Sequence, residues 1–195
     1  MFKAVLASVM VFLTAMALES PAGGGPQNVL VVVNDQSQAS MELGHYYQQR
    51  RDIPERNILR VSVTPGDNMS VAVFTNAIRG PVLKYIASAG LSNQIQMVLF
   101  SCDIPYRVLG SDEGNNQNAL TAAMFYGFQD YPWTAWPLPA AVYSDYYAAE
   151  RSFDHAAAPS SGRYYISSMI TASNLDAAMQ VVEWSAAADS ARPAG

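Results

Sequence analysis

The clearest candidate nucleophile is Cys102, the single cysteine of this 195-residue chain. It lies two positions after an apolar stretch, residues 94–100, that is typical of a buried strand. A thiol at the carboxyl end of a parallel strand can attack a carbonyl group if a histidine serves as its base, as in caspase-like peptidases. His45 and His155 are the two histidines, and no spacing ties either to Cys102. The alternative is that Cys102 is a small buried apolar residue, as most free cysteines are.

The two histidines also have simpler interpretations. His45 falls within a predicted helix and is expected on its solvated face. His155 follows Asp154 in a predicted loop, where the two could pair or where the histidine could simply lie at the surface.

Arg107 is the candidate for holding an anion, because it follows the same apolar stretch at a short distance. A guanidinium group can bind a carboxylate or a phosphate with two parallel hydrogen bonds. An ion pair of purely structural value with Asp103, Asp112 or Glu113 would explain Arg107 equally well. The sequence leaves both interpretations open.

An unusual density of aromatic residues marks positions 125–165, with four prolines between them. The prolines predict an irregular segment, because proline cannot continue a helix or donate to a sheet. Trp133 and Trp136 are candidates for stacking against sugar rings, since tryptophan presents a flat apolar face with a polar rim. Packing within the core and the loops is the alternative role for this group of aromatic residues.

Several classes of site are excluded by what the chain lacks. One cysteine and two histidines leave no zinc cluster, and the acids Asp112, Glu113 and Asp130 do not have the spacing of a calcium loop. No phosphate-binding loop, dinucleotide-binding glycine motif or G-x-S-x-G sequence occurs. The net charge of −5 argues against binding to nucleic acid. We therefore predict no cofactor, no metal and no nucleic-acid partner.

The N-terminus has the pattern of a secretory signal peptide. Lys3 precedes an uncharged run, residues 4–18, and Ala15 and Ala17 give the small-x-small pattern of a cleavage site. The run is shorter than the roughly 20 residues that span a bilayer, although a retained anchor is the alternative. We predict a signal peptide over residues 1–17 and a linker over 18–27. Cleavage would remove 17 of the 195 residues and leave 178.

Apolar patterns predict alternating strands and helices in the remaining chain. Strands are expected at residues 28–34, 58–63, 94–100 and 164–170. Helices are expected at residues 40–51, at 71–90 with a break or kink at Gly80-Pro81, and from Ser173 as N-cap to about Ala187. Residues 109–118 are predicted to form a surface loop. This order favours an α/β fold: a mainly parallel sheet with helices on both faces and an aromatic-rich irregular insertion before the last strand–helix unit. One domain, residues 28–189, precedes a frayed tail at 190–195.

Four stretches together resemble a known family. They are residues 28–34 with 40–47, residues 51–58, residues 95–108, and residues 165–170 with 177–187. They are similar to an uncharacterised exported bacterial family whose members occur in species with exosortase and the PEP-CTERM protein-sorting system. The most specific signature pairs Y-Y-x-x-R-R-x-I-P-x-x-N-I with a later strand ending in I-P-x-R-V.

The resemblance implies export and an α/β fold, and it brings no catalytic residue. Members of the family usually have a Thr-Lys-Gly-like turn where this chain has residues 101–103, so Cys102 is not expected to be a shared nucleophile. They also continue well beyond the helix that ends near Ala187, which implies a fragment or a shortened member.

The leading expectation is an exported cell-envelope protein, in the periplasm, the envelope or the medium, without a membrane span after cleavage. One alternative is a hydrolase or peptidase acting on envelope protein, with Cys102, His155 and Arg107 as its site. The other is a module that binds exopolysaccharide or envelope protein, with Arg107, Trp133 and Trp136 as its site.

Overall fold

The computed structural model describes residues 25–110, 116–128 and 165–190. The strands are β1 (Val29–Asn34), β2 (Ile58–Val61), β3 (Asn68–Ser70), β4 (Met97–Phe100), β5 (Arg107–Leu109), β6 (Gln117–Ala119) and β7 (Ile166–Met169). The helices are α2 (Gln38–Arg50), α3 (Val71–Val73), α4 (Gly80–Ser88), α5 (Leu120–Tyr126) and α6 (Leu175–Ser190), with a π-helix, η3 (Phe74–Arg79), and two short 3₁₀ turns, η1 (Pro26–Asn28) and η2 (Glu55–Asn57). In this part of the chain, no helix combines the length and the apolar character needed to cross a membrane.

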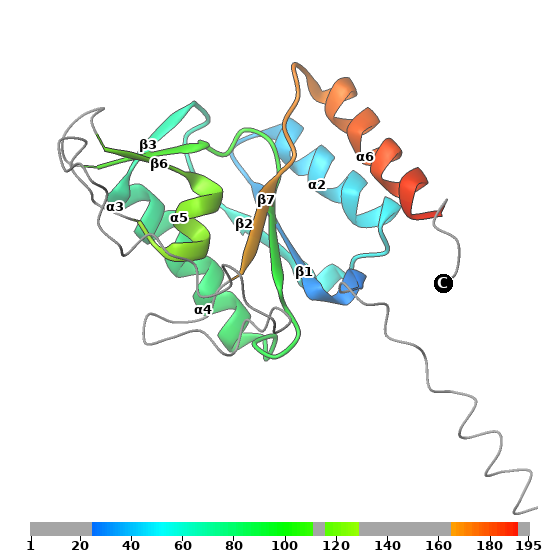
Figure 1. Cartoon of the computed structure of the whole chain (residues 1–195), viewed down its shortest axis with the longest axis horizontal. Helices are drawn as coiled ribbons and strands as arrows, with labels where there is room; N and C mark the ends of the chain where they lie inside the picture. Colours follow the sequence, from blue (N-terminus) through cyan, green and yellow to red (C-terminus); the bar gives the residue numbers. More distant parts are fainter. Residues whose placement is uncertain (1–24, 111–115, 129–164, 191–195) are drawn as a thin grey trace, which may run out of the picture.

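A four-stranded sheet, which we call sheet A, forms the centre of the fold. Its order is β2-β1-β4-β7, and every neighbouring pair is parallel. Helices α2 and α6 cover one face, whereas α3, α4 and α5 lie on the other (Figure 1). The predicted α/β fold, with a mainly parallel sheet and helices on both faces, is confirmed.

The two faces of sheet A have separate apolar cores. Val31 and Val33 of β1 pack under α2 and α6, while Leu30 and Val32 pack on the side of α4 and α5. Because both faces are covered, the successive residues of β1 from Leu30 to Asn34 are all buried. This explains why the strand reads as a continuous apolar run rather than an alternating one.

Helix α2 lies unusually close to β1, because Gly44 faces the sheet without a side chain. A Cβ atom at Gly44 would lie 2.1 Å from Cγ1 of Val33, far inside van der Waals contact. The close approach seats Leu43 in the core that α2 and α6 share.

At Gly80-Pro81 the sequence predicted a kink or two short helices, and the alternative of two separate helices is wrong. The helix runs without interruption from α3 through η3 into α4, and its backbone is wider at η3. Pro81 lacks an N–H group and its ring crowds the carbonyl four residues earlier, so the register of the helix must shift. The Gly80 N–H group instead bonds the Thr75 carbonyl, where a Cβ atom on Gly80 would lie only 2.8 Å from that oxygen.

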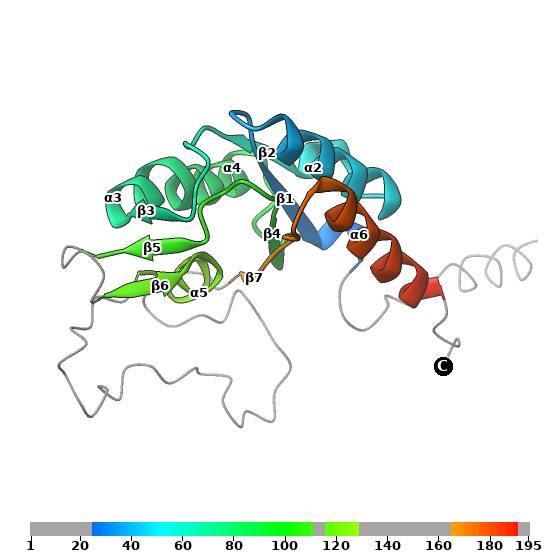
Figure 2. The same cartoon turned by 90° about the horizontal axis from the view of Figure 1, so that it is seen from above.

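A second small sheet, absent from the sequence prediction, lies beside sheet A (Figure 2). Its order is β3-β5-β6, with β3 and β5 parallel and β5 and β6 antiparallel. The predicted loop over residues 109–118 is therefore wrong at both ends, because Leu109 pairs with Gln117. Each strand of this sheet has only three residues, polar and apolar ones together, which is too few to show the alternation typical of a strand.

Two further expectations concern the C-terminal half. The strand predicted over 164–170 is confirmed as β7. Helix α6 begins one residue later than predicted, because Asn174 rather than Ser173 accepts the N–H of Ala177, at 2.8 Å. Most of the predicted irregular insertion lies outside the described residues, and its first members, Phe125 and Tyr126, belong to α5 instead.

Candidate functional site

The carboxyl edge of sheet A is the first place to look for a ligand. Strand β1 lies between β2 and β4, and the connection leaving β1 leads to β2 whereas the connection leaving β4 leads toward β7, so the two diverge at this edge. Open parallel sheets bind ligands in the crevice that forms at such a point. In this protein that crevice is bounded by Asn34 at the end of β1 and by residues 101–103 after β4.

Asn34 fills the bottom of the crevice and is completely buried. Its amide nitrogen donates to the carbonyl oxygens of Val63 and Asp103, both at 2.8 Å. Its amide oxygen accepts the N–H groups of Gln36 and Val63, both at 3.2 Å. These four bonds use both donors and both acceptor positions of the amide, so none is left for a ligand.

Three serines and Asp103 fill the rest of this crevice with further hydrogen bonds. Ser37 caps α2 by accepting the N–H of Ser40 at 3.1 Å, and its hydroxyl donates to Oδ2 of Asp103 at 2.5 Å. Ser40 accepts the N–H of Asn34 at 2.9 Å, and Ser101 donates to the carbonyl of Ser40 at 2.8 Å. We call Asn34, Ser37, Ser40, Ser101 and Asp103 the edge network. It ties β1, α2 and the exit of β4 together with their own polar groups.

Cys102 adjoins this network, half-buried against the core that α2 and α6 share. Burial raises the pKa of its thiol, and the neighbouring carboxylate of Asp103 raises it further. A reactive cysteine needs the opposite environment, because the thiolate is the nucleophile. His45 bonds Gln48, at 3.2 Å between Nδ1 and Oε1, and His155 lies outside the described residues. The nucleophilic role of Cys102 stays a prediction.

Arg107 lies on β5, in the small sheet. Its guanidinium stands 5.0 Å from the centre of the Tyr106 ring and donates to the Tyr106 hydroxyl at 2.9 Å. Within the described residues it forms an ion pair with Asp67, at 3.9 Å, and both side chains are well exposed. Asp67 was not among the acids considered from the sequence, and Asp112 and Glu113 lie outside the described residues. Such an exposed pair contributes little to stability.

Trp133 and Trp136, the predicted sugar-stacking residues, also lie outside the described residues. Whether they bind a ligand stays a prediction.

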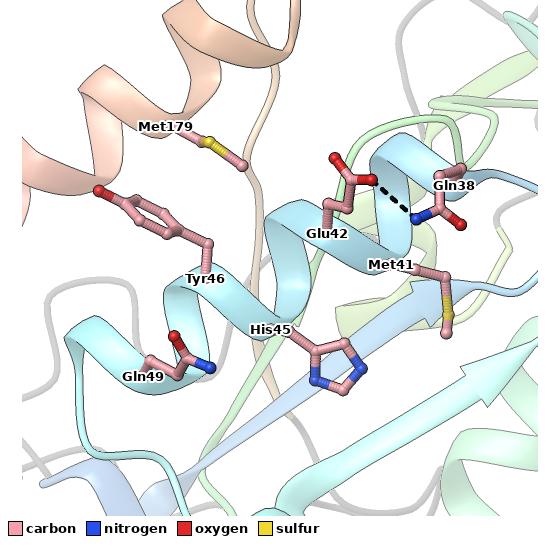
Figure 3. Close-up of a pocket in the computed structure, with 7 residues that line it drawn as sticks. All are labelled: Gln38, Met41, Glu42, His45, Tyr46, Gln49 and Met179. Atoms are coloured by element: carbon pink, nitrogen blue, oxygen red, sulfur yellow. Dashed lines mark hydrogen bonds between the residues drawn. The ribbon is translucent and has the colours of Figure 1, made fainter.

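An open groove lies elsewhere, on the outer surface of α2 beside α6. It encloses about 390 Å³. Its lining residues are Gln38, Met41, Glu42, His45, Tyr46 and Gln49 from α2, and Met179 from α6. Figure 3 shows Met179 reaching from α6 toward Tyr46, while Met41 and His45 project from the other flank of α2. We call this the α2–α6 groove.

One end of the groove is held in place by a cluster of charges. The Tyr46 hydroxyl donates to Glu183 of α6, and the Arg50 guanidinium donates to the other oxygen of Glu183 at 2.5 Å. The hydrogen bond from Arg50, followed by that from Tyr46, lowers the pKa of Glu183. The bond to Glu183 is also the main reason that the pKa of Tyr46 is raised. Arg50 and Glu183 thereby fix the orientation of the Tyr46 ring.

Three polar side chains along the groove, those of Gln38, Glu42 and Gln49, are exposed, whereas Asn34 of the edge network is buried. Gln38 donates to Glu42 at 2.7 Å, which orients both side chains along α2. The exposed amide of Gln49 has no protein partner in the part of the chain that the structure describes. The groove therefore presents amide, carboxylate, imidazole and phenol groups next to two methionines, and no lysine or arginine lines it.

The sequence analysis singled out only His45 among these residues. The polar positions 38, 42, 45 and 49 recur at helical spacing, and this pattern is the same as that of an ordinary solvated helix face.

Among the described residues, no group of three or more His, Cys, Asp or Glu side chains could hold a metal ion. No protein-family model, no curated protein and no solved structure matches this chain.

Proposed function

We propose that this chain is an exported cell-envelope protein that binds neutral polysaccharide in its α2–α6 groove. The observation that carries this proposal is a contrast in hydrogen bonding: the Asn34 amide of the edge network is saturated by protein groups, whereas the exposed Gln49 amide of the groove has no protein partner among the described residues. A hydrolase acting through Cys102 receives less support, because burial and Asp103 both raise the pKa of the thiol.

The chemistry of the groove favours a neutral, hydroxyl-rich ligand. Each side-chain amide offers both donors and acceptors, as each sugar hydroxyl does. The ring of Tyr46 and the thioether of Met179, which lie on the same flank of α2 (Figure 3), suit the apolar face of a sugar ring. The lining holds no cation and one carboxylate, Glu42, so an acidic polysaccharide would be repelled.

Binding is tested by calorimetric titration of the purified protein with a neutral glucan, a neutral galactomannan and acidic alginate. We expect binding to a neutral polymer and none to alginate. Gln49→Ala should weaken binding about tenfold, because one or two ligand hydrogen bonds are lost. Gln180→Ala, an exposed glutamine of α6 outside the groove, is the matched control and should have no effect. Binding that is equally sensitive to both changes, or that is absent for every neutral polymer, would contradict the proposal.

Export and membership of the exosortase-associated family form the second part of the proposal. They are supported by the pattern of residues 1–17 and by the four stretches that resemble the family. Expression of the full chain in a Gram-negative bacterium should yield periplasmic protein whose first residue is Leu18. Ala17→Tyr should leave the precursor uncleaved, because signal peptidase needs a small residue there. Full-length protein confined to the cytoplasm would disprove export.

A further inference from the structure

The edge of sheet A at β7 has unpaired hydrogen-bonding groups. In the described part of the chain β7 pairs with β4 alone. The N–H groups of Ile166 and Ile170 donate to the carbonyls of Gln96 and Phe100, both at 2.9 Å. Alternate residues of a strand direct their backbone groups to opposite sides, so those of Ser167 and Met169 point away from β4.

The same edge has apolar side chains that remain in solvent. Met169 packs into the core beside α4 and α5, whereas Ile170 packs into the one beside α2 and α6. By alternation, Ile166 and Ser168 face the α2 and α6 side. Both are exposed there, and the exposed fraction of Ile166 is 40%.

Helix α6 extends this exposed apolar surface. Met179 and Glu183 face α2 and Val182 faces the core, so Val181 lies on the flank away from α2, and Trp184 lies between that flank and the solvent-facing side. Within the layer, α6 lies on the β7 side of α2 (Figure 2), so its flank away from α2 is on the side of the edge strand. Trp184 is 66% exposed and Val181 is 42% exposed. Both are large apolar side chains that a folded surface usually covers in part.

Strand β7 has none of the features that usually prevent pairing at an edge. Its sequence, Ile166-Ser167-Ser168-Met169, contains no charge and no proline. Exposed edge strands normally avoid association through lysine, proline or a bulge. This open edge, with exposed Ile166 on the side of α2 and α6, is therefore a surface that can accept a further strand.

We propose that this surface is the interface of a homodimer in which two β7 strands pair antiparallel about a twofold axis at Ser168. This pairing sets Ser167 opposite Met169 of the second copy, and Met169 opposite Ser167 of the second copy. Because these are the residues whose backbone groups point outward, the two strands form four hydrogen bonds. The two sheets become one sheet of eight strands, and the inference is independent of the ligand of the groove.

The register explains why the partner is a second copy of the chain. The pairing places exposed Ile166 opposite Ile170 of the second copy, on the α6 side of the joined sheet. An axis perpendicular to the sheet keeps both α6 helices on that side, so the exposed Val181 of each copy is on the same side of the joined sheet as the Ile166 and Ile170 contacts. The edge is thus complementary to itself in both hydrogen bonds and apolar contacts, and it carries no charge that would repel a copy.

The test is sedimentation velocity of the purified protein over a wide range of concentration. The wild type should sediment at twice the mass of the chain. Ser167→Pro removes only an outward N–H group and should weaken the dimer roughly thirtyfold, because each copy loses one hydrogen bond. Ser168→Lys brings like charges together at the axis and should also give monomers. Ser88→Lys, at the end of α4 on the other face of sheet A, is the matched control and should remain dimeric.

Thermal unfolding of each variant shows that loss of the dimer is not loss of the fold. A wild type that stays monomeric at the highest concentration overturns the proposal. A dimer that survives both Ser167→Pro and Ser168→Lys overturns it equally, because the interface would then lie elsewhere.

Discussion

The carboxyl edge of sheet A and the α2–α6 groove contrast in how they use polar side chains. At the edge, Asn34 and its neighbours bond one another, and every donor and acceptor of the Asn34 amide is used. In the groove, side chains of the same types line an open surface and Gln49 has no protein partner within the described residues. One region consumes its hydrogen-bonding capacity in the fold, and the other retains it.

The comparison shows that the strand order determines where a binding site could form, whereas the side chains at that place determine whether one does. The divergence of crossovers beside β1 produces a crevice in any sheet of this order. In this protein the N-cap of α2 and the turn after β4 fill that crevice, and Asp103 takes a left-handed backbone conformation (φ 56°) to do so. A binding function is then left to the outer surface of the helices.

The largest expected effect comes from opening the edge network. Asn34→Ala removes four hydrogen bonds and takes the side-chain donor away from the buried carbonyl of Val63 and the partly buried carbonyl of Asp103. We expect the free energy of unfolding to fall by about 3 kcal/mol or more, measured by denaturant titration. Gln36→Ala, on the exposed side of the same turn, should cost less than about 0.5 kcal/mol. A mild effect of Asn34→Ala would mean that the network is not structural, and the contrast would fail.

Gly44→Ala tests whether the groove depends on the seating of α2. The new methyl group would overlap Val33, at a cost of about 1–3 kcal/mol. The higher helix propensity of alanine offsets about 1 kcal/mol of this cost. We therefore expect the free energy of unfolding to fall by up to about 2 kcal/mol and polysaccharide binding to weaken. Gly66→Ala is the control, because a Cβ atom there would meet nothing within 4 Å. Higher stability of Gly44→Ala would show that α2 can move away from β1 freely.

Glu183→Gln addresses the charged end of the groove and should have a smaller effect. Hydrogen bonds hold the pKa of Glu183 below its ordinary value of about 4.3, so folding favours the carboxylate. The stabilisation is complete above that ordinary value and is lost as the pH falls through the lower pKa of the folded protein. The melting temperature of the wild type should therefore drop more on acidification than that of Glu183→Gln. Parallel pH profiles for the two proteins would contradict this assignment.

The smallest expected change follows Cys102→Ser. We expect the free energy of unfolding to change by less than about 0.5 kcal/mol and the function to be retained. In the wild type the raised thiol pKa should make alkylation by iodoacetamide slower at neutral pH than that of a free cysteine, and faster as the pH rises. Rapid labelling of the folded protein at neutral pH would instead restore the hydrolase interpretation.

Local patterns were sufficient to predict most of the fold. The apolar run of β1, the stripe of the helix at residues 71–88 and the order of the elements all follow from the intrinsic periods of strands and helices. The errors occurred where local signals conflicted or were too short. Gly80-Pro81 indicates a break, yet the wider turn of η3 accommodates it, and three-residue strands such as β6 carry no usable period.

The candidate site depended much more on tertiary structure. Asn34 bonds residues that follow it by 29 and 69 positions, and Tyr46 meets Glu183 after 137 positions. Such contacts arise from the crossovers and from the docking of α6 against α2, and no local pattern encodes them. A single asparagine or glutamine carries the same chemistry in either region. Which polar residue is enclosed by its neighbours, and which is left free to bind, is decided only when elements distant in the chain pack together.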